Sequence, residues 1–263
     1  MFRVRRLVAV GAVPLLLLAA APASADPITA GFTEIKQVAN LPGNALFTDP
    51  NAVNSWGLAL SPTSPIWSAN NGTNTATLYT GGLNGATVGK AGLTVTIDSD
   101  GPTGQVFNGT GKFVVPGGAS APFIFDTESG DVAAWSPPAN ATHALVMAHV
   151  AGAVFKGLAL WNTANGPFLL ATDFAQGRVD VFDSAFTQVD LDGALFRDPD
   201  LPKGYAPFNV MTVGDQVYVT YAKQQAGSDD EAHGPGLGVV DVYTDGGTTV
   251  HRVSTHGRLN APW

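Results

Sequence analysis

The segment Trp56–Pro62, WGLALSP, decides the fold of this chain together with the segment that follows it, Pro65–Asn70, PIWSAN. The two segments predict a short apolar strand, a proline-containing turn and a second short strand that ends on polar residues. The same pattern returns as Phe155–Leu160, FKGLAL, followed by Pro167–Asp173, PFLLATD. A strand pair that recurs along a chain indicates a repeated structural unit.

Three weaker copies of the opening strand extend the series. They lie at 103–108, TGQVFN, at 206–210, APFNV, and at 261–263, APW. The corresponding positions, which stand 47, 53, 52 and 54 residues apart, are Gly57, Gly104, Gly157, Asn209 and Trp263. A period near 50 residues is typical of β-propellers, in which each repeat forms one blade.

The remainder of each unit also predicts strands. In the third unit, Leu169–Asp173 leads through a glycine-containing turn to Arg178–Asp183, in which apolar and polar residues alternate. No long stretch that lacks glycine and proline has the apolar spacing of a helix. The sequence therefore predicts an all-β chain built from blades of four short antiparallel strands.

The count of units predicts about four blades. They open near residues 56, 104, 157 and 208, and the segment 261–263 begins a fifth. A six-bladed ring would need roughly 100 further residues at this period. We therefore expect residues 26–263 to be an incomplete propeller domain, truncated at its C-terminus.

The first 25 residues have the pattern of a secretion signal. Three arginines precede an apolar run, Leu7–Ala20, and small residues, Ala23–Ala25, then form a cleavage site. A membrane anchor is the alternative, but the run is shorter than the roughly 20 residues that a span needs, and Pro14 and Pro22 interrupt it. We expect cleavage after Ala25 and a secreted, extracellular protein without a membrane span.

Charge and cysteine content exclude several classes of function. The sequence has 13 basic residues, and cleavage of the signal removes three of them. The mature chain would then carry about 10 basic and 21 acidic residues, which gives a formal charge of about −11. Nucleic acids and anionic membranes need a basic surface, and we expect neither as a partner. The chain has no cysteine, which excludes thiol catalysis and a lipoprotein anchor.

Five segments of the sequence carry a resemblance to known proteins: Thr48–Ala59, Lys156–Ala159, Val179–Asp183, Leu201–Asn209 and Leu259–Trp263. Through these segments the chain resembles a family of uncharacterised exported bacterial β-propeller proteins. Ser55 and Ser68 depart from it, since proline and valine are usual there. The resemblance implies a six-bladed propeller related to the NHL and gluconolactonase-like groups, and a longer chain than this one. It implies no established activity.

Polar residues at the ends of the second strands are the candidates for a ligand site in the central channel. They are Asn70, Asn71, Asp126 and Asp173, to which we add Asn209 from the fourth opening segment. Their oxygen atoms could hold Ca²⁺ or Mg²⁺. The alternative is that these side chains cap turns by accepting backbone N–H groups. The same two interpretations apply to Asp49.

An acidic loop is the second candidate for a cation site. Asp229, Asp230 and Glu231 are consecutive and His233 follows, but their spacing does not match an EF-hand. The candidate metal ligands are therefore Asp173, Asp229, Asp230 and Glu231, with a solvated acidic loop as the alternative. The tryptophans at 56, 67, 135 and 161 predict packing between blades, and a sugar platform is their other interpretation.

No catalytic motif is present in the sequence. There is no His-Glu-x-x-His pair, nucleophile elbow or phosphate-binding loop. We therefore expect a binding or interaction module for a small molecule, a glycan or a protein, monomeric at full length. The alternative is a lactonase-like hydrolase or lyase that depends on a divalent cation in the central channel.

Overall fold

Strands dominate the part of the chain that the computed structural model describes, residues 33–190 and 195–263. No α-helix is found within these residues, which confirms the all-β prediction. Every element described below belongs to one unit, Ile35–Trp263. The expected signal peptide, residues 1–25, lies outside the described residues.

The long strands form four successive groups. The first group contains β3 (Ser55–Ala59), β4 (Ile66–Asn70), β5 (Thr75–Gly81) and β6 (Val88–Ile97). The second contains β7 (Pro102–Phe107), β10 (Phe123–Thr127), β11 (Asp131–Trp135) and β12 (His143–His149). The third contains β13 (Phe155–Thr163), β14 (Gly166–Asp173) and β15 (Arg178–Phe182). The fourth contains β16 (Tyr205–Val213), β17 (Gln216–Lys223), β18 (Gly238–Thr244) and β19 (Thr249–Ser254).

Several short strands and 3-10 helices lie outside the long strands of these groups. Two-residue strands pair as β1 (Val38–Ala39) with β2 (Phe47–Thr48) and as β8 (Val114–Val115) with β9 (Ala119–Ser120). Three single-turn 3-10 helices are η1 (Asn71–Thr73), η2 (Leu83–Gly85) and η3 (Asp245–Gly247).

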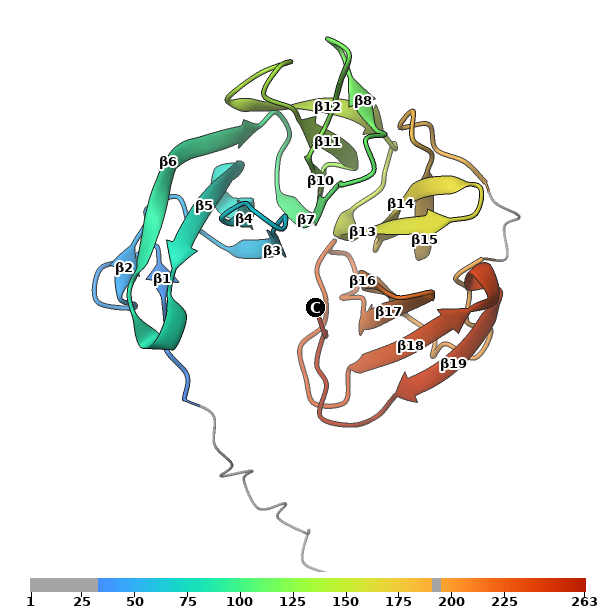
Figure 1. The fold of residues 1–263 in the computed structure, drawn as a ribbon. Coiled ribbons are helices and arrows are strands. Elements are labelled where there is room, and N and C mark those ends of the chain that lie inside the picture. The colour runs from blue at the N-terminus through green and yellow to red at the C-terminus, as the bar shows by residue number, and fades with distance from the viewer. Residues whose placement is uncertain (1–32, 191–194) are drawn as a thin grey trace, which may run out of the picture. The chain divides into compact units, whose positions relative to one another are not determined.

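Neighbouring strands within a group are antiparallel and follow the chain order. The first strands of the groups, β3, β7, β13 and β16, lie side by side toward the middle of the fold (Figure 1). At the outer side, β6 and β12 pair in parallel and join the first two groups into one eight-stranded sheet. Since β3 and β7 are neighbours as well, this sheet nearly closes on itself.

The repeated opening segment has the same irregularity in all four groups. The register between the first and second strands shifts between Ser55 and Leu58 in the first group and between Phe155 and Leu158 in the third. Equivalent shifts occur opposite Gly104 and beside Asn209. A β-bulge bends its strand and redirects the neighbouring side chains. The structure thus repeats at the positions that mark the period in the sequence.

Glycine at these positions allows each first strand to approach the next. A Cβ atom at Gly57 would lie 2.5 Å from the carbonyl oxygen of Thr103, and one at Gly104 would lie 2.2 Å from the backbone nitrogen of Leu158. At Gly157 it would lie 2.8 Å from the Cα atom of Asn209. Real Cβ atoms do not come so close to backbone atoms, so no side chain fits at these contacts.

The segment 261–263 contacts the fourth group as 207–209 contacts the third. The Thr172 hydroxyl donates to the carbonyl oxygen of Phe208 at 3.3 Å, and the Thr220 hydroxyl donates to that of Pro262 at 2.5 Å. Both threonines lie in the second strand of their group. The match agrees with the assignment of 261–263 to another copy of the opening strand.

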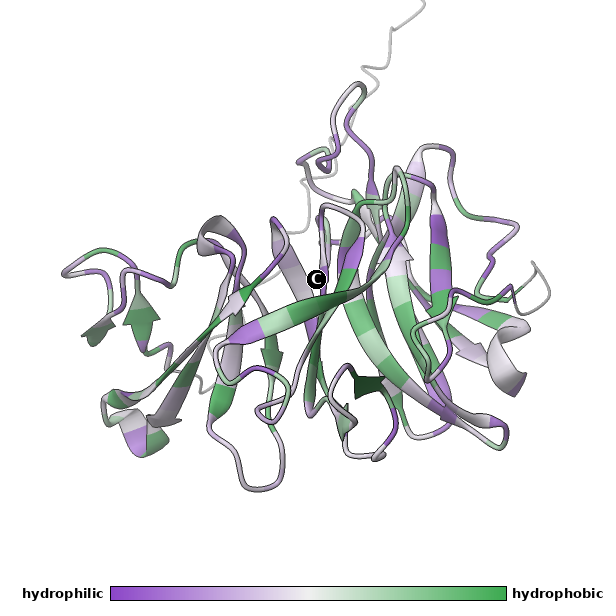
Figure 2. Ribbon diagram, turned by 90° about the horizontal axis from the view of Figure 1, so that it is seen from above, coloured by the Kyte–Doolittle hydropathy of each residue, from purple (hydrophilic) through white to green (hydrophobic). Residues whose placement is uncertain are grey.

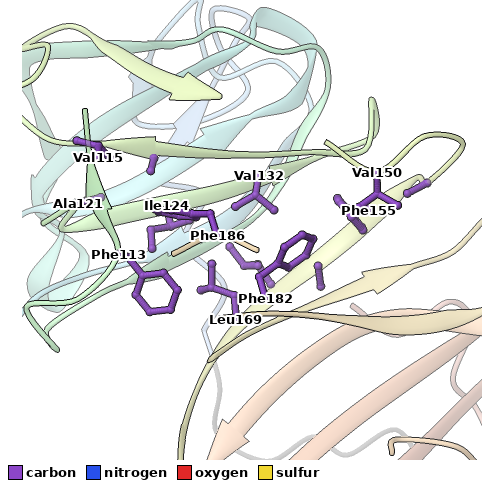
Figure 3. Close-up of a cluster of buried hydrophobic side chains, with 14 residues drawn as sticks. Phe113, Val115, Ala121, Ile124, Val132, Val150, Phe155, Leu169, Phe182 and Phe186 are labelled. Carbon is purple, nitrogen blue, oxygen red and sulfur yellow. The ribbon is translucent and has the colours of Figure 1, made fainter. Parts of the chain in front are cut away.

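Hydrophobic residues concentrate on the strands (Figure 2). Their side chains pack between neighbouring groups. One buried cluster joins Ile124 and Val132 of the second group to Phe155, Leu169 and Phe182 of the third (Figure 3). Such inter-group packing buries the faces that a single group would expose to water.

The tryptophans largely behave as expected. Trp67 is buried and stacks on Phe123 with ring centroids 4.1 Å apart, and the buried Trp135 ring lies 4.8 Å from that of Trp67. Trp161 is half-buried and packs edge-on against Phe196. Trp56 packs edge-on against Phe208 of the fourth group, with ring centroids 5.9 Å apart, and it also borders the candidate site described below.

Substitution of Gly104 by alanine tests the contact between first strands. The added Cβ has no space between β7 and β13, so we expect the free energy of unfolding to fall by about 1–3 kcal/mol. Gly92 in β6 is the matched control, because nothing lies within 4 Å of a Cβ there, and alanine should leave stability nearly unchanged. Urea denaturation measures both, and equal effects would contradict the close-contact explanation.

Candidate functional site

The candidate residues at the second-strand ends lie at one end of the strand groups. Asn70 pairs with Ser55 and Asp173 pairs with Phe155, the residues at which β3 and β13 begin. Thr127, next to Asp126, pairs with Pro102 at the beginning of β7. We call this end, at which the first strands begin, the top face.

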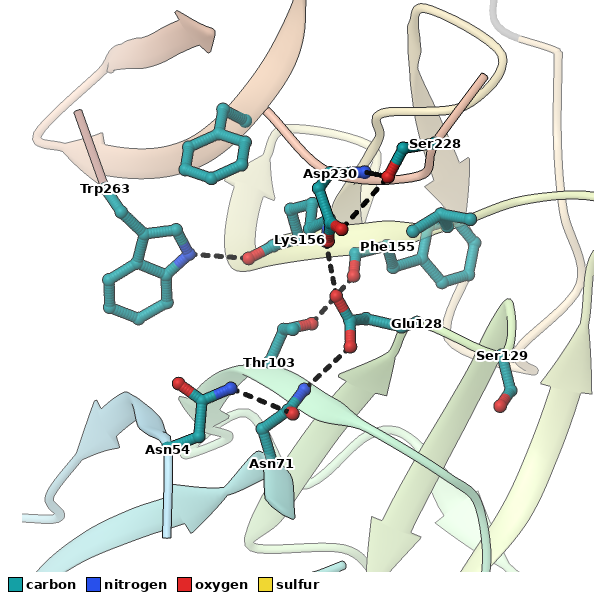
Figure 4. A network of polar contacts seen from close by, with 12 residues as sticks. Asn54, Asn71, Thr103, Glu128, Ser129, Phe155, Lys156, Ser228, Asp230 and Trp263 are labelled. Carbon is teal, nitrogen blue, oxygen red and sulfur yellow. Dashed lines mark hydrogen bonds and ion pairs between the residues drawn. The ribbon is translucent and has the colours of Figure 1, made fainter. Parts of the chain in front are cut away.

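Four polar residues from three groups meet on the top face. The Asn54 amide nitrogen donates to Asn71 Oδ1 at 3.1 Å, and the Asn71 amide nitrogen donates to Glu128 Oε2 at 2.9 Å (Figure 4). The Lys156 ammonium donates to the other oxygen of the same carboxylate, Oε1. We call Asn54, Asn71, Glu128 and Lys156 the Glu128 cluster.

Lys156 is the most unusual member of this cluster. Its side chain is 1% exposed, and the Nζ atom lies 5.5 Å from the ring centroid of Trp56 and 5.9 Å from that of Phe174. A cation over aromatic faces at such distances is attracted by their electron density. A buried charge still requires a counter-ion, and Glu128 supplies it from the neighbouring group.

Two tryptophans border the cluster. The Trp263 indole nitrogen donates to the backbone carbonyl of Lys156 at 2.6 Å, and the rings of Trp56 and Trp263 meet edge-on with centroids 5.5 Å apart. Trp56 is half-buried, and the Glu128 side chain is 32% exposed. The cluster therefore presents an aromatic ring, amides and a carboxylate to solvent.

Asp126 lies next to this surface but is fully buried. Its Oδ1 atom accepts hydrogen bonds from the Thr103 hydroxyl at 3.0 Å and from the Gly104 backbone at 2.6 Å, while Oδ2 has no hydrogen-bond partner among the described residues. Burial raises the pKa of Asp126 to about 7 against these two hydrogen bonds. The carboxyl group therefore keeps its proton to a higher pH than an exposed aspartate does.

The Asn70 side chain forms its hydrogen bonds within the first group. Its Oδ1 atom accepts from the Ser55 hydroxyl at 2.8 Å, and its amide nitrogen donates to Thr77 at 2.9 Å and to Thr75 at 3.2 Å. The residue is completely buried. Of the adjacent pair in the sequence, the structure brings only Asn71 into the Glu128 cluster.

Asp49 belongs to the same buried network as Asn70. It accepts from the Asn51 backbone at 3.0 Å, as the turn interpretation predicts, but it also binds the Tyr79 hydroxyl at 2.6 Å and the Lys90 ammonium at 2.8 Å. Burial favours a higher pKa for Asp49, yet the hydrogen bonds from these partners hold its pKa below the ordinary value. The sequence does not predict this ion pair.

The side chains of Asp173 and Asn209 accept hydrogen bonds from backbone nitrogens. Asp173 Oδ1 accepts from the backbone nitrogens of Val154 at 3.2 Å and Gln176 at 3.0 Å, which is the turn-capping alternative. Burial raises its pKa as well. Asn209 accepts from the Val210 backbone at 2.8 Å and packs against Gly157.

The acidic loop does not form a cation site with Asp173. Asp230 accepts from the Ser228 hydroxyl at 3.0 Å (Figure 4), and Glu231 lies 4.0 Å from the His233 ring nitrogen. Asp229 is exposed. Over residues 33–190 and 195–263, no three acidic or histidine side chains converge as metal ligands. Binding of Ca²⁺ or Mg²⁺ stays a prediction.

Sequence reasoning missed Glu128, Lys156 and Asn54. Lys156 stands at the repeat position occupied by Trp56, Thr103 and Phe208, so a charge among uncharged equivalents was the available signal. Glu128 follows Asp126 by two residues and has no such mark.

Comparisons with known proteins support the fold and leave the function open. No family model matches the chain. An uncharacterised protein of Acanthamoeba polyphaga mimivirus, R648, is 32% identical over 86% of this chain, and a second, L690, is 30% identical over 83%. The chain spans 58% and 60% of the lengths of these relatives. They are viral and do not support the expected bacterial family.

A solved structure of virginiamycin B lyase from Staphylococcus aureus has a similar fold. It matches with a TM-score of 0.50 and 10% identity, over 82% of this chain and 60% of the lyase. The likeness supports a β-propeller architecture for the four strand groups. Within the described residues, no helix has the length and apolar character of a membrane span.

Removal of the Glu128 charge should destabilise the protein. Glu128→Gln leaves the buried Lys156 ammonium without a counter-ion, and we expect a loss of about 1–3 kcal/mol in the free energy of unfolding. In Lys156→Met/Glu128→Gln no buried charge remains, so the double variant should be more stable than Glu128→Gln alone. Thermal and urea denaturation measure the stability of both variants. A double variant that is no more stable than Glu128→Gln would refute the pairing.

The raised pKa of Asp126 predicts a pH dependence of stability. Between pH 4 and 7 the unfolded chain releases this proton while the folded protein keeps it, so stability falls as pH rises through this window. Asp126→Asn cannot titrate and keeps an oxygen acceptor for Thr103 and Gly104. The free energy of unfolding of Asp126→Asn minus that of the wild type should increase from pH 4 to pH 7. A difference independent of pH would contradict the assignment.

Proposed function

We propose that this chain is part of a secreted β-propeller that binds a neutral polar ligand, a glycan, at the Glu128 cluster. One observation carries the proposal: the top face gathers Asn54, Asn71 and Glu128 beside the half-buried ring of Trp56. Binding sites combine aromatic surface with a few well-placed polar groups in this way.

The charge balance of the cluster favours a neutral ligand. The carboxylate of Glu128 already neutralises Lys156, so neither charge is left to select an ion of opposite sign. The amides of Asn54 and Asn71 offer both donors and acceptors, which suit the hydroxyl groups of a sugar. The half-buried indole ring of Trp56 offers an apolar face for the sugar ring.

Secretion, a six-bladed ring and a monomeric full-length protein belong to the same proposal. The pattern of residues 1–25 supports export, and the period of about 50 residues supports the propeller. Both mimivirus relatives are longer than this chain.

A divalent-cation-dependent hydrolase or lyase is the second candidate. Its support is Asp126, because a carboxyl group with a pKa of about 7 can act as an acid or a base at neutral pH. Ca²⁺ or Mg²⁺ would have to recruit ligands that the described residues do not bring together. Similarity to a lyase concerns the fold alone and does not favour this candidate.

A glycan array followed by calorimetry tests the binding proposal. We expect the protein to bind a neutral glycan in the presence of EDTA. Asn54→Ala and Glu128→Gln should each weaken that binding about tenfold, the effect of one lost hydrogen bond to a partly exposed polar group. Circular dichroism at the assay temperature confirms that both variants are folded.

Asp215→Asn is the matched control. Asp215 is an exposed carboxylate in the turn between β16 and β17, at the end opposite the top face, and its substitution should not change glycan binding. Failure to bind any glycan, or equal binding by all three variants, would overturn the proposal. Turnover that needs Ca²⁺ or Mg²⁺ and is lost in Asp126→Asn would support the enzyme instead.

A further inference from the structure

Three Asn-x-Thr triplets occur in the sequence, and the structure separates them by the state of their asparagines. They are Asn71–Thr73, Asn108–Thr110 and Asn140–Thr142, and none has proline in the middle position. In an exported protein such a triplet is the acceptor signal for an N-linked glycan, which requires a surface position. The sugar is attached to the side-chain amide nitrogen, Nδ2, so the surroundings of that atom decide which triplet can carry a glycan.

Asn108 has no room for a glycan. The residue is 4% exposed, and its Nδ2 atom donates to the backbone carbonyls of Lys112 at 2.9 Å and Ala121 at 2.8 Å. The Ser120 hydroxyl lies 3.3 Å from the same nitrogen. A sugar at this atom would replace one of its two hydrogens and would place a bulky polar group in a buried position.

Asn71 uses its amide nitrogen in the Glu128 cluster. Its Nδ2 atom donates to Glu128 Oε2 at 2.9 Å. The hydroxyl of Thr73, the third residue of the triplet, donates to the backbone carbonyl of Asn51 at 2.8 Å and not to Asn71. A glycan here would cover the polar groups that form the proposed ligand site.

Asn140 lies in the turn between β11 and β12, far along the strands from the top face. β11 ends at Trp135, which pairs with Phe123 at the beginning of β10, and β10 ends at the top face. The turn is therefore at the opposite end of the second group. Ala141 and Thr142, the next two residues of the triplet, are both exposed.

The amide of Asn140 holds this turn through its oxygen alone. Oδ1 accepts from the backbone nitrogens of Thr142 and His143, both at 3.1 Å, and from the Thr142 hydroxyl at 3.5 Å. Among the described residues, Nδ2 donates to no group. Asn140 thus combines a turn that is already ordered with a nitrogen that no other group uses.

We propose that Asn140 is the acceptor of an N-linked glycan. The proposal rests on the secretion proposed above, since the donor is an oligosaccharide on a lipid diphosphate and the enzyme is a transferase of a secretory pathway. Nδ2 forms a bond to the anomeric carbon of the sugar, and the bond from that carbon to the diphosphate oxygen breaks. The lipid diphosphate leaves, and the proton lost by Nδ2 passes to a basic group of the transferase.

The attached glycan is compatible with the fold and with the proposed ligand site. Oδ1 keeps its two backbone hydrogen bonds after the reaction, because only Nδ2 changes. The Glu128 cluster lies at the other end of the strand groups, so a glycan on Asn140 leaves it open. A glycan also adds a hydrophilic, solubilising surface to the turn that carries it.

Expression of the whole chain in insect cells tests the proposal. We expect folded protein purified from the medium to carry one N-linked glycan. Release of the glycan by peptide N-glycosidase in heavy-oxygen water labels the modified asparagine, and peptide mass spectrometry should find the label at Asn140 and not at Asn71 or Asn108. Circular dichroism confirms that the purified protein is folded.

Matched variants identify the acceptor. Asn140→Gln and Thr142→Ala should each lose the glycan, whereas Thr142→Ser keeps a hydroxyl in the triplet and should retain it. Asn165→Gln is the control, because Asn165 is an exposed asparagine in the turn between β13 and β14 that belongs to no such triplet. This variant should be modified like the wild type.

The outcomes separate this proposal from those before it. Secreted protein that is unmodified at Asn140, or folded secreted protein with a glycan on Asn71 or Asn108, would overturn it. Retention of the chain inside the cells would overturn the proposed secretion and this site together. Glycan binding is measured on enzymatically deglycosylated protein, so a failure of that proposal leaves the result at Asn140 unaffected.

Discussion

The fold depends on the close contact between the first strands of neighbouring groups. Gly57 touches the backbone of β7, Gly104 that of β13, and Gly157 that of β16, at distances that leave no space for a side chain. Asn209 follows in the series without being glycine, and it fits because Gly157 opposite makes the room. Close backbone approach sets the distance from one group to the next, and it brings the Thr103 hydroxyl to 2.8 Å from the carbonyl oxygen of Phe155, to which it donates.

The same close contacts between first strands also position the residues of the candidate site. The bulge at each contact places Trp56, Thr103, Lys156 and Phe208 at equivalent points near the top face. Only one of the four is charged, and it obtains its counter-ion from Glu128 in the preceding group. Because the polar contacts cross from group to group, the site exists only when the groups are packed together.

The repeat, the all-β class and the turn-capping alternative for Asp173 could be predicted from the sequence, since each depends on local residue patterns. The role of Asn70 could not, because its partners Thr75 and Thr77 become neighbours only through the register of β4 with β5. Glu128 and Lys156 are 28 residues apart in the sequence, and the ion pair depends on how two groups pack.

The parallel pairing of β6 with β12 distinguishes one boundary between groups from the others. His143 and Ala144 pair with Thr96 and Ile97, and His143 also bonds to Asp98 at 2.7 Å. A backbone ladder therefore links the first two groups, whereas side-chain contacts and single hydrogen bonds dominate the later boundaries. We therefore expect the first two groups to respond to partial unfolding as a single block, and the later boundaries to separate before it does.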